Sequence, residues 1–287
     1  MTIEELIALL SLERLEANLF RGQNQDIGSP SIFGGQVLAQ AMAAASATVE
    51  GRSVHSLHSY FLRAGDKAKP VVYEVDRIRD GGTFTTRRVV AIQNGKAIFT
   101  AAISYQLAEQ GFDHQCPAPE APPPEELESD HGYRVALAHR LPEDQREFFA
   151  RERPVELRPV APEVFYSDES GPPEQMLWMR AVGKMPDDPD LHQAVLAYAS
   201  DFYLIGASLK PHGVRFFTGE VQSASLDHAM WFHRPFRADE WLLYVMDSPS
   251  ASQARGLNSG RIFSRDGALV ASCMQEGLIR SFAAKPA

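Results

Sequence analysis

Two parts of the chain show the same order of helical and strand-like patterns. Residues 34–49 form an alanine-rich run with helical spacing, and residues 191–209 form a second run of this type. Each helical pattern is followed by four alternating, strand-like runs bounded by turn residues. The runs are 54–65, 70–81, 84–95 and 96–106 in the first part, and 223–236, 240–250, 254–267 and 268–280 in the second. We therefore expect two α+β units, each with a helix packed on an antiparallel sheet.

The two units also match in detail. The stretch Tyr60–Arg63 corresponds to Trp231–Arg234, and the turn glycines Gly95 and Gly267 follow these arginines by 32 and 33 positions. A duplicated unit is the economical interpretation. A chance similarity between two unrelated α+β halves is the alternative.

The composition changes between the two units. Residues 116–126 read CPAPEAPPPEE, and because proline lacks an amide donor this stretch predicts a linker and not core. Residues 154–163 form a second extended stretch, and the charged residues 143–153 between them predict a short surface helix. The expected division is an N-terminal repeat over 1–115, a linker over 116–165 and a C-terminal repeat over 166–287.

Composition and charge limit the function classes. The chain has 287 residues, of which 44% are hydrophobic, so it can bury a sizeable core. Its net charge of −9 argues against nucleic-acid binding, although a local group of arginines can still hold a small anion. The two cysteines, Cys116 and Cys273, form no CxxC motif and indicate a reducing compartment. Without a basic leader or an apolar run of about 20 residues, we expect a cytoplasmic protein with no membrane partner.

Asp201 is the most unusual residue of the second helical run. Its neighbours three and four positions away are Ala197, Tyr198, Leu204 and Ile205, so its carboxylate lies on an apolar stripe. The alternatives are that Asp201 faces water or caps a helix that breaks nearby.

Comparison of the two units singles out two further polar residues. Ser225 and Gln275 of the second unit correspond to Val54 and Ile103 of the first, and residues 34–49 contain no counterpart of the Asp201 carboxylate. Buried polar groups are costly without partners, so three such substitutions on one scaffold indicate a site.

Several long stretches together resemble the acyl-CoA thioesterase II family. They lie between about Leu12 and Arg280 and include FGGQVLAQAM, HSLHSYFLRAGD, YASDFYLIGASLKPHG, DHAMWFHRPF and VASCMQEGLIR. The resemblance implies a double hotdog fold, in which each of two repeats has a central helix wrapped by a curved antiparallel sheet. It also implies hydrolysis of acyl-CoA to a fatty acid and coenzyme A.

The resemblance assigns the family's catalytic Asp, Thr and Gln to Asp201, Ser225 and Gln275. Serine in place of threonine keeps the hydroxyl and loses a methyl group, so its rotamer is less restricted. We expect Asp201 to act as general base on a water that Ser225 and Gln275 hold. Since a thioester carbonyl is already electrophilic, we expect neither a metal nor a cofactor.

Other candidate residues concern the oxyanion and the carbonyl. Gly34 and Gly35 precede the first helical run, where amides favour developing negative charge, but tight packing also explains them. His58 is a candidate positioning group or alternative base. A lone histidine on a strand is more often structural, and no evident Ser or Cys and Asp partners complete a relay.

The expected partners are the acyl-CoA substrate and further copies of the chain. Five arginines on predicted strands or at their ends are candidates for the coenzyme A phosphates, and surface ion pairs are the alternative. They are Arg63, Arg87, Arg88, Arg234 and Arg255. Exposed sheet edges and the resemblance indicate a homo-oligomer, either a dimer or a tetramer.

Two rival functions remain open at this point. The first is an enoyl-CoA hydratase on the same scaffold, which Asp187–His192 echoes without the expected glycine. The second is a non-catalytic acyl-CoA-binding protein, which loss of one of the three site residues would favour.

Overall fold

The computed structural model describes residues 1–141, 143–215 and 221–282. Over this part of the chain one antiparallel sheet has the strand order β1-β2-β4-β5-β6-β3-β10-β13-β12-β11-β8-β7, and β9 pairs with β13. The N-terminal strands are β1 (Glu13–Glu16), β2 (Leu19–Gly22), β3 (Ser53–Phe61), β4 (Val71–Asp80), β5 (Phe84–Gln93) and β6 (Lys96–Gln106). The C-terminal strands are β7 (Val155–Pro159), β8 (Glu174–Ala181), β9 (Val221–Ser225), β10 (Asp227–Phe232), β11 (Leu242–Ser252), β12 (Arg255–Ser264) and β13 (Leu269–Ser281).

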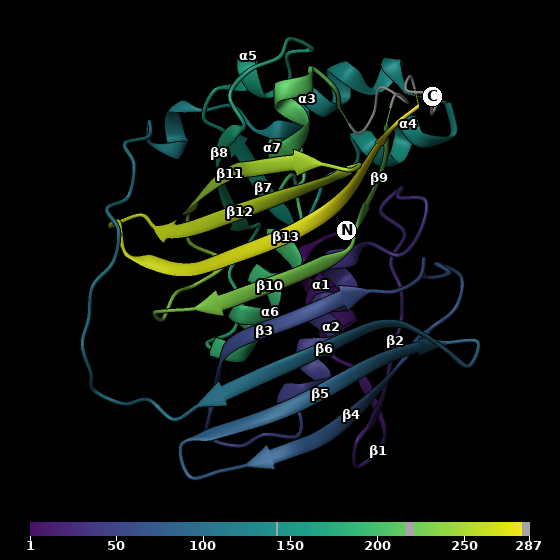
Figure 1. Ribbon diagram of the computed structural model, residues 1–287, viewed down its shortest axis with the longest axis vertical. Coiled ribbons are helices and arrows are strands. Elements are labelled where there is room, and N and C mark those ends of the chain that lie inside the picture. The colour runs from purple at the N-terminus through teal and green to yellow at the C-terminus, as the bar shows by residue number, and fades with distance from the viewer. Residues whose placement is uncertain (142, 216–220, 283–287) are drawn as a thin grey trace.

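Two long helices lie together on one side of this sheet. Helices α2 (Gly34–Ser46) and α6 (Pro189–Ser200) lie behind the curved strands in Figure 1 and are buried along most of their length. Alanine dominates α2, which lets the helices and the strands approach closely. Because each half of the sheet wraps one helix, the expected double hotdog fold is confirmed.

Shorter helices surround this scaffold. They are α1 (Ile3–Leu10), η1 (Pro124–Glu126), α3 (Asp130–Leu137), η2 (Ala138–Arg140), α4 (Glu143–Ala150), α5 (Pro162–Phe165), α7 (Gly206–Leu209) and η3 (Lys210–His212). In the part of the chain described, no helix combines the length and the apolar character needed to cross a membrane.

The two halves repeat the same local contacts. Arg63 donates through Nη1 to the Ala97 carbonyl at 2.6 Å, and Arg234 donates through Nη1 to the Leu269 carbonyl at 2.9 Å. The backbone amides of the two arginines bond to the carbonyls of Ile98 and Val270. Strands β3 and β10 join the halves at the centre of the sheet, with Ala229 opposite His58. These equivalent contacts are what a duplicated unit predicts.

The second helical run is not continuous, which corrects the prediction for 191–209. Helix α6 ends at Ser200, Asp201 is its C-cap, and α7 begins only at Gly206. Tyr203 lies between them in the left-handed region, with φ of 64°. The Tyr244 hydroxyl donates to the Ser200 carbonyl at 2.8 Å, which satisfies a helix-end acceptor and lets the chain leave the helix.

The strand-like run 223–236 is also interrupted. It forms β9 and β10, separated at Leu226, whose amide bonds to the Glu276 carbonyl and whose carbonyl accepts from the Phe61 amide. Periodicity alone did not locate this break, because Leu226 still bonds to neighbouring strands on both sides.

The proline-rich segment is more than a linker, which corrects the prediction for 116–126. Its residues Cys116, Ala118 and Ala121 pack against a second apolar cluster on the C-terminal half of the sheet. The members of that cluster are Trp178, Trp241, Leu243, Val245 and Phe263. The Trp178 indole also donates to the Pro122 carbonyl at 2.9 Å. Proline is tolerated because this segment covers the sheet without joining its hydrogen-bond ladder.

Elements between β6 and α6 were only partly predicted. The charged stretch 143–153 forms α4, as expected, and the extended stretch 154–163 contains the edge strand β7. Helix α3 and strand β8 had no counterpart in the sequence-based interpretation.

The close approach of α2 to α6 makes a test of the fold. A Cβ added at Gly35 would overlap the backbone carbonyl oxygen of Tyr198, which cannot move without shifting α6. We expect Gly35→Ala to lower the free energy of unfolding by about 2 kcal/mol or more, since overpacking a core typically costs 1–3 kcal/mol. Thermal or urea unfolding measures this loss.

Gly82→Ala is the matched control, because a Cβ there meets no heavy atom within 4 Å. It should change stability by less than about 0.5 kcal/mol. Equal stability of the two variants would contradict the packing argument.

Candidate functional site

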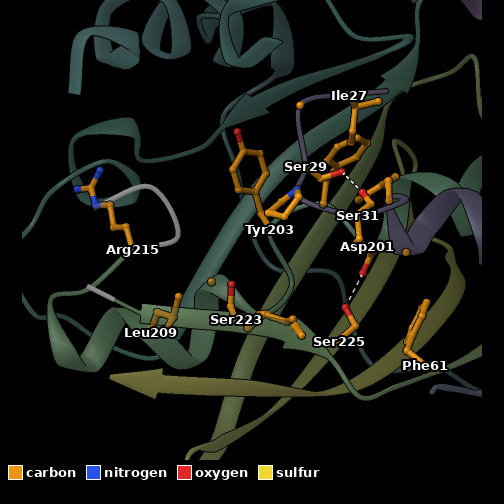
Figure 2. Close-up of a pocket in the computed structure, with 18 of the residues that line it drawn as sticks. Ile27, Ser29, Ser31, Phe61, Asp201, Tyr203, Leu209, Arg215, Ser223 and Ser225 are labelled. Carbon is orange, nitrogen blue, oxygen red and sulfur yellow. Dashed lines mark hydrogen bonds between the residues drawn. The ribbon is translucent and has the colours of Figure 1, made fainter. Parts of the chain in front are cut away.

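Three polar side chains from different elements meet at the end of α6. The Gln275 amide nitrogen on β13 donates to Asp201 Oδ1 at 2.7 Å and to Ser225 Oγ at 2.9 Å. The Ser225 hydroxyl, at the end of β9, lies 3.5 Å from the same Asp201 oxygen. Figure 2 shows the Asp201 and Ser225 side chains pointing toward one another. The structure therefore brings together the three residues that the comparison of repeats singled out.

The second oxygen of Asp201 binds the other repeat. The Gly35 backbone amide at the start of α2 donates to Asp201 Oδ2 at 2.8 Å. A helix N-terminus carries partial positive charge, so it stabilises a carboxylate at this position. A Cβ at Gly34 would lie 2.8 Å from the same oxygen, so a larger residue there would displace the carboxylate. The site thus combines residues of both halves.

Gln275 supports the other two residues from behind. Its side chain is fully buried and does not line the cavity described below. An amide nitrogen carries two hydrogens, and here both are used, one by Asp201 and one by Ser225. This geometry differs from the expected direct contact with water and leaves water binding to Asp201 and Ser225.

A buried polar network holds the last turn of α6. Ser200 Oγ donates to the Ala197 carbonyl and lies 3.1 Å from Nε2 of His228, which therefore carries the hydrogen. The Tyr244 hydroxyl contacts both the Ser200 carbonyl and the Cys273 sulfur. Burial raises the pKa of the Cys273 thiol to about 12, so this cysteine stays protonated.

Burial also keeps His228 neutral. The side chain is inaccessible to solvent, and desolvation lowers its pKa below the usual value, while the nearby Asp201 acts in the opposite direction. His228 and its neighbour Asp227, which accepts from the Glu276 amide at 2.7 Å, both bond within the protein, as the sequence favoured.

Asp201 and Ser225 open onto a cavity of about 690 Å³. Its walls come from residues 27–34, from the end of β3, from the segment between α4 and β8, and from residues 201–215 and 223–226.

Figure 2 shows Tyr203 on one side of Asp201, with Ser29 and Ser31 nearby and Arg215 farther away. Most of the lining is apolar, with aromatic rings such as Phe33, Phe61 and Phe202 next to the carboxylate. A cavity of this kind suits a ligand with a long apolar portion.

The charges of the cavity wall differ from those of the whole chain. Among the described residues that line it, Asp201 is the one acid, and the four cations are Arg63, Arg153, Lys210 and Arg215. The complete chain has 28 Lys and Arg against 37 Asp and Glu. The cavity is therefore locally positive within an acidic protein, and such a field attracts anionic ligands.

Of the three candidates for binding the oxyanion or positioning the substrate, Gly35 and His58 make contacts other than those expected. The Gly35 amide binds Asp201, so it is not free to donate to an oxyanion, while Gly34 lines the cavity. His58 is exposed on the outer face of the sheet, where its ring packs edge-on against Trp231 at 5.2 Å. On a strand, the buried Leu57 and the exposed His58 must face opposite sides, so His58 is directed away from the cavity.

Arg87 is a correction among the phosphate candidates. Its side chain is buried, and its guanidinium bonds to both the Thr48 hydroxyl and carbonyl and to Asp80. It thereby closes the end of the α2 segment from β5, since Thr48 directly follows the C-cap Ala47. A cation is favoured there by the helix dipole, which gives Arg87 a structural role.

The other arginine candidates also have protein partners. Arg88 pairs with Asp76, Arg234 with Asp113 and Arg255 with Glu276, and none of the three lines the cavity. For these, the surface ion pairs named as the alternative are what the structure contains. Arg63 lines the cavity, although one of its nitrogens bonds to the Ala97 carbonyl.

Several cavity residues were not identified from the sequence. Arg153, Tyr203 and Lys210 line the wall. The first two lie just beyond the observed ends of α4 and α6, within runs predicted to be helical, and Lys210 lies just after the second of these runs. The Lys210 ammonium donates to the carbonyls of Val164 and Glu169, and burial lowers its pKa. A lysine and an arginine in apolar surroundings at Leu209–Arg215 were a signal that could have been noted.

Comparison with known proteins identifies the family of the chain. The family model described as acyl-CoA thioesterase matches residues 144–278, and the model described as acyl-CoA thioesterase N-terminal domain matches residues 21–106. Acyl-CoA thioesterase 2 of Haemophilus influenzae is 41% identical over 279 residues, covering 97% of this chain and 98% of the relative. Acyl-coenzyme A thioesterase 8 of Homo sapiens is 43% identical over 285 residues, covering 95% and 88%.

Solved structures give the same result. The acyl-CoA thioesterase II TesB2 from Mycobacterium marinum has a TM-score of 0.79 and 43% identity, with 98% of each chain covered. A hot dog fold protein of unknown function from Alicyclobacillus acidocaldarius has a TM-score of 0.77 at 18% identity, with 96% of this chain and 98% of that chain covered, a likeness of fold alone.

The neutral His228 predicts how stability depends on pH. In the unfolded chain a histidine binds a proton below about pH 6.5, whereas burial in the folded protein lowers the pKa of His228. The unfolded state therefore binds more protons, so the free energy of unfolding falls as pH drops below about 6.5. We expect His228→Gln to show a shallower fall between pH 7 and 5, by up to about 1.4 kcal/mol per pH unit.

Urea unfolding at a series of pH values measures this slope. His139→Gln, at an exposed position, is the control and should keep the wild-type slope. A wild-type slope in His228→Gln would show that this histidine does not contribute.

Proposed function

Because the chain belongs to the acyl-CoA thioesterase II family, we propose that it hydrolyses acyl-CoA with Asp201 as general base. The products are a free fatty acid and coenzyme A. The observation that carries this proposal is the Asp201 carboxylate at the wall of an apolar cavity, held there by the Gln275 amide and the Gly35 backbone.

The arrangement supports the following chemistry. A water between Asp201 and Ser225 loses a proton to the carboxylate while its oxygen attacks the thioester carbonyl carbon. The carbonyl oxygen becomes an oxyanion, and when the C=O bond reforms, the C–S bond breaks. The thiolate of coenzyme A then takes up a proton, for which protonated Asp201 is the source. Gln275 and Gly35 orient the carboxylate and Ser225 during both steps.

The oxyanion requires a donor other than Gly35. We propose the Gly34 amide, which lies in the cavity wall at the N-terminus of α2, where the helix dipole favours negative charge. The amide next to it holds the base, so one helix end would serve both groups.

The positive cavity supports a coenzyme A thioester as the substrate. Coenzyme A carries phosphates, and the acyl chain is apolar, which agrees with cations in a largely apolar wall. Of the five arginines proposed from the sequence, Arg63 is kept as a phosphate candidate because it lines the cavity.

The hydratase alternative has little support from the site. In the segment Asp187–His192, Asp188 caps α6 at its other end and buried His192 accepts from the Ala238 amide. Neither residue lines the cavity, so no Asp and His pair is available next to a bound acyl group.

Cellular location and assembly are further proposals. We propose a cytoplasmic homo-oligomer, either a dimer or a tetramer. The exposed edge strand β1, all of whose residues are solvent-accessible, supports association between copies.

The first test concerns the base. We expect Asp201→Asn to release thiol from acyl-CoA at least about 100-fold more slowly than wild type, the scale of a lost general base. Binding of acyl-CoA should persist, and a thiol-reactive dye together with calorimetry measures both quantities. Asp190→Asn, at the opposite end of the same helix, is the control and should keep wild-type turnover. Undiminished turnover in Asp201→Asn would remove this residue from the mechanism.

The second test concerns the hydroxyl. Ser225→Ala removes a group that accepts from Gln275 and faces the cavity, so we expect kcat to fall by about tenfold or more. Ser225→Thr keeps the hydroxyl and restricts its rotamer, and should retain activity within about threefold. Equal loss in both variants would indicate that the position matters for packing and not for its hydroxyl.

A further inference from the structure

Arg153 occupies an unusual position in the cavity wall. It precedes β7, its guanidinium lies over the Phe202 ring at 4.7 Å, and Phe202 directly follows Asp201. Nη1 of Arg153 lies 3.3 Å from Asp130 Oδ2 and 3.4 Å from the Tyr203 hydroxyl. These are long contacts, so the guanidinium is placed by several weak interactions.

The buried charges around Arg153 do not balance. Asp130 and Arg134 form an ion pair at 2.9 Å, and their side chains are 3% and 1% exposed. Within the described chain, Asp130 is the one carboxylate that pairs with either arginine. Two cations therefore share one carboxylate. Burying an unbalanced charge is costly, and perturbed charges of this kind cluster at functional sites.

Arg153 lines the cavity, and part of its guanidinium has no acceptor among the described residues. Both contacts with acceptors in the described residues use Nη1, whereas an arginine carries five N–H groups on three nitrogens. Nε and Nη2 thus remain available for a ligand, and the side chain is 22% exposed as part of the wall. Asp130 and Tyr203 fix the opposite edge, and Tyr203 lies only two residues after Asp201.

We propose that Arg153 binds an anionic oxygen of the thioester substrate, either a coenzyme A phosphate or a carboxylate on the acyl group. This inference rests on the proposed function and adds a binding residue to it. A planar guanidinium can form two parallel hydrogen bonds to either anion. The anion would balance the excess charge of the Asp130, Arg134 and Arg153 cluster.

If Arg153 were only a structural contact, Arg153→Met would lower the melting temperature. The contacts of Asp130 lead to a different expectation. Asp130 already has Arg134 as a closer partner, and the Tyr203 hydroxyl donates to Asp130 at 3.0 Å without help from Arg153. Removal of Arg153 would leave a neutral ion pair behind. The melting temperature of Arg153→Met should therefore stay at the wild-type value or rise.

Steady-state kinetics with three substrates tests the proposal. Two substrates carry the same acyl group, one on coenzyme A and one on pantetheine, which lacks the phosphates. The third substrate is a pantetheine thioester whose acyl group ends in a carboxylate. We expect Arg153→Met to raise KM at least about tenfold only where the recognised anion is present, with kcat within about twofold. A loss confined to the coenzyme A thioester identifies the phosphate, and a loss that follows the acyl carboxylate identifies that group.

Two further variants sharpen the result. Arg153→Lys keeps the positive charge but lacks the planar guanidinium that forms two parallel hydrogen bonds, and it should have an intermediate KM. Arg88→Met removes an exposed arginine outside the cavity and should match wild type. An unchanged KM of Arg153→Met on all three substrates, or an equal fall in kcat on all three, overturns the proposal. A melting temperature lowered by more than about 4 °C also overturns it, because that indicates a structural contact.

A different result would show that the proposed function is wrong. Wild-type protein would then release no thiol from any acyl-CoA. The binding role of Arg153 would still be tested by titrating coenzyme A and a long-chain dicarboxylate into wild type and Arg153→Met. Weaker binding of one of them by the variant supports the role, and equal binding of both overturns it.

Discussion

The site depends on the contact between the end of one helix and the start of another. Asp201 caps α6 at its C-terminus, where the helix dipole disfavours negative charge. The N-terminus of α2 offsets this effect, because the Gly35 amide donates to the carboxylate at 2.8 Å. The glycines at 34 and 35 allow this approach, since a side chain at either would meet Asp201 or the α6 backbone. An acid can remain at the cavity wall because the two helices are packed in this way.

The joined sheet makes that contact possible. Strands β3 and β10 pair at its centre, so the two curved halves place α2 and α6 against each other. Gln275 on β13 and Ser225 on β9 then approach the carboxylate from the sheet. Neither half contains the complete site, because the base comes from the second repeat and one of its hydrogen-bond donors from the first. The packing that forms the fold therefore also assembles the site.

Much of this could be predicted from the sequence, and the reasons for success and failure are physical. The repeats were visible because apolar periodicity reports which faces are buried, and Asp201, Ser225 and Gln275 stood out as polar residues at apolar positions of the other repeat. The break after Ser200 was named only as an alternative, because periodicity does not show the Tyr244 hydroxyl that supports it from 44 residues away in the chain. Arg87 was misassigned for a related reason, since its burial against Thr48 is a tertiary property. Arg153 and Tyr203 were missed because they lay inside runs predicted to be helical, whereas both follow the observed ends of α4 and α6 and reach the cavity through tertiary packing.

The two repeats use opposite charges at equivalent helix ends. Behind the last turn of α2, Arg87 donates to the carbonyl of Thr48, so that end is closed by a cation. The last turn of α6 instead ends in a carboxylate and continues into Tyr203 in the left-handed region. Local opening costs most where side chains are buried and the backbone is held by neighbouring groups. Residues 194–200 at the end of α6 are buried, whereas Ser46 and Ala47 at the end of α2 are accessible to solvent. Backbone amides at the end of α2 should thus exchange with deuterium sooner than those at the end of α6, so the duplicated scaffold is stiffer at the helix end that carries the acid.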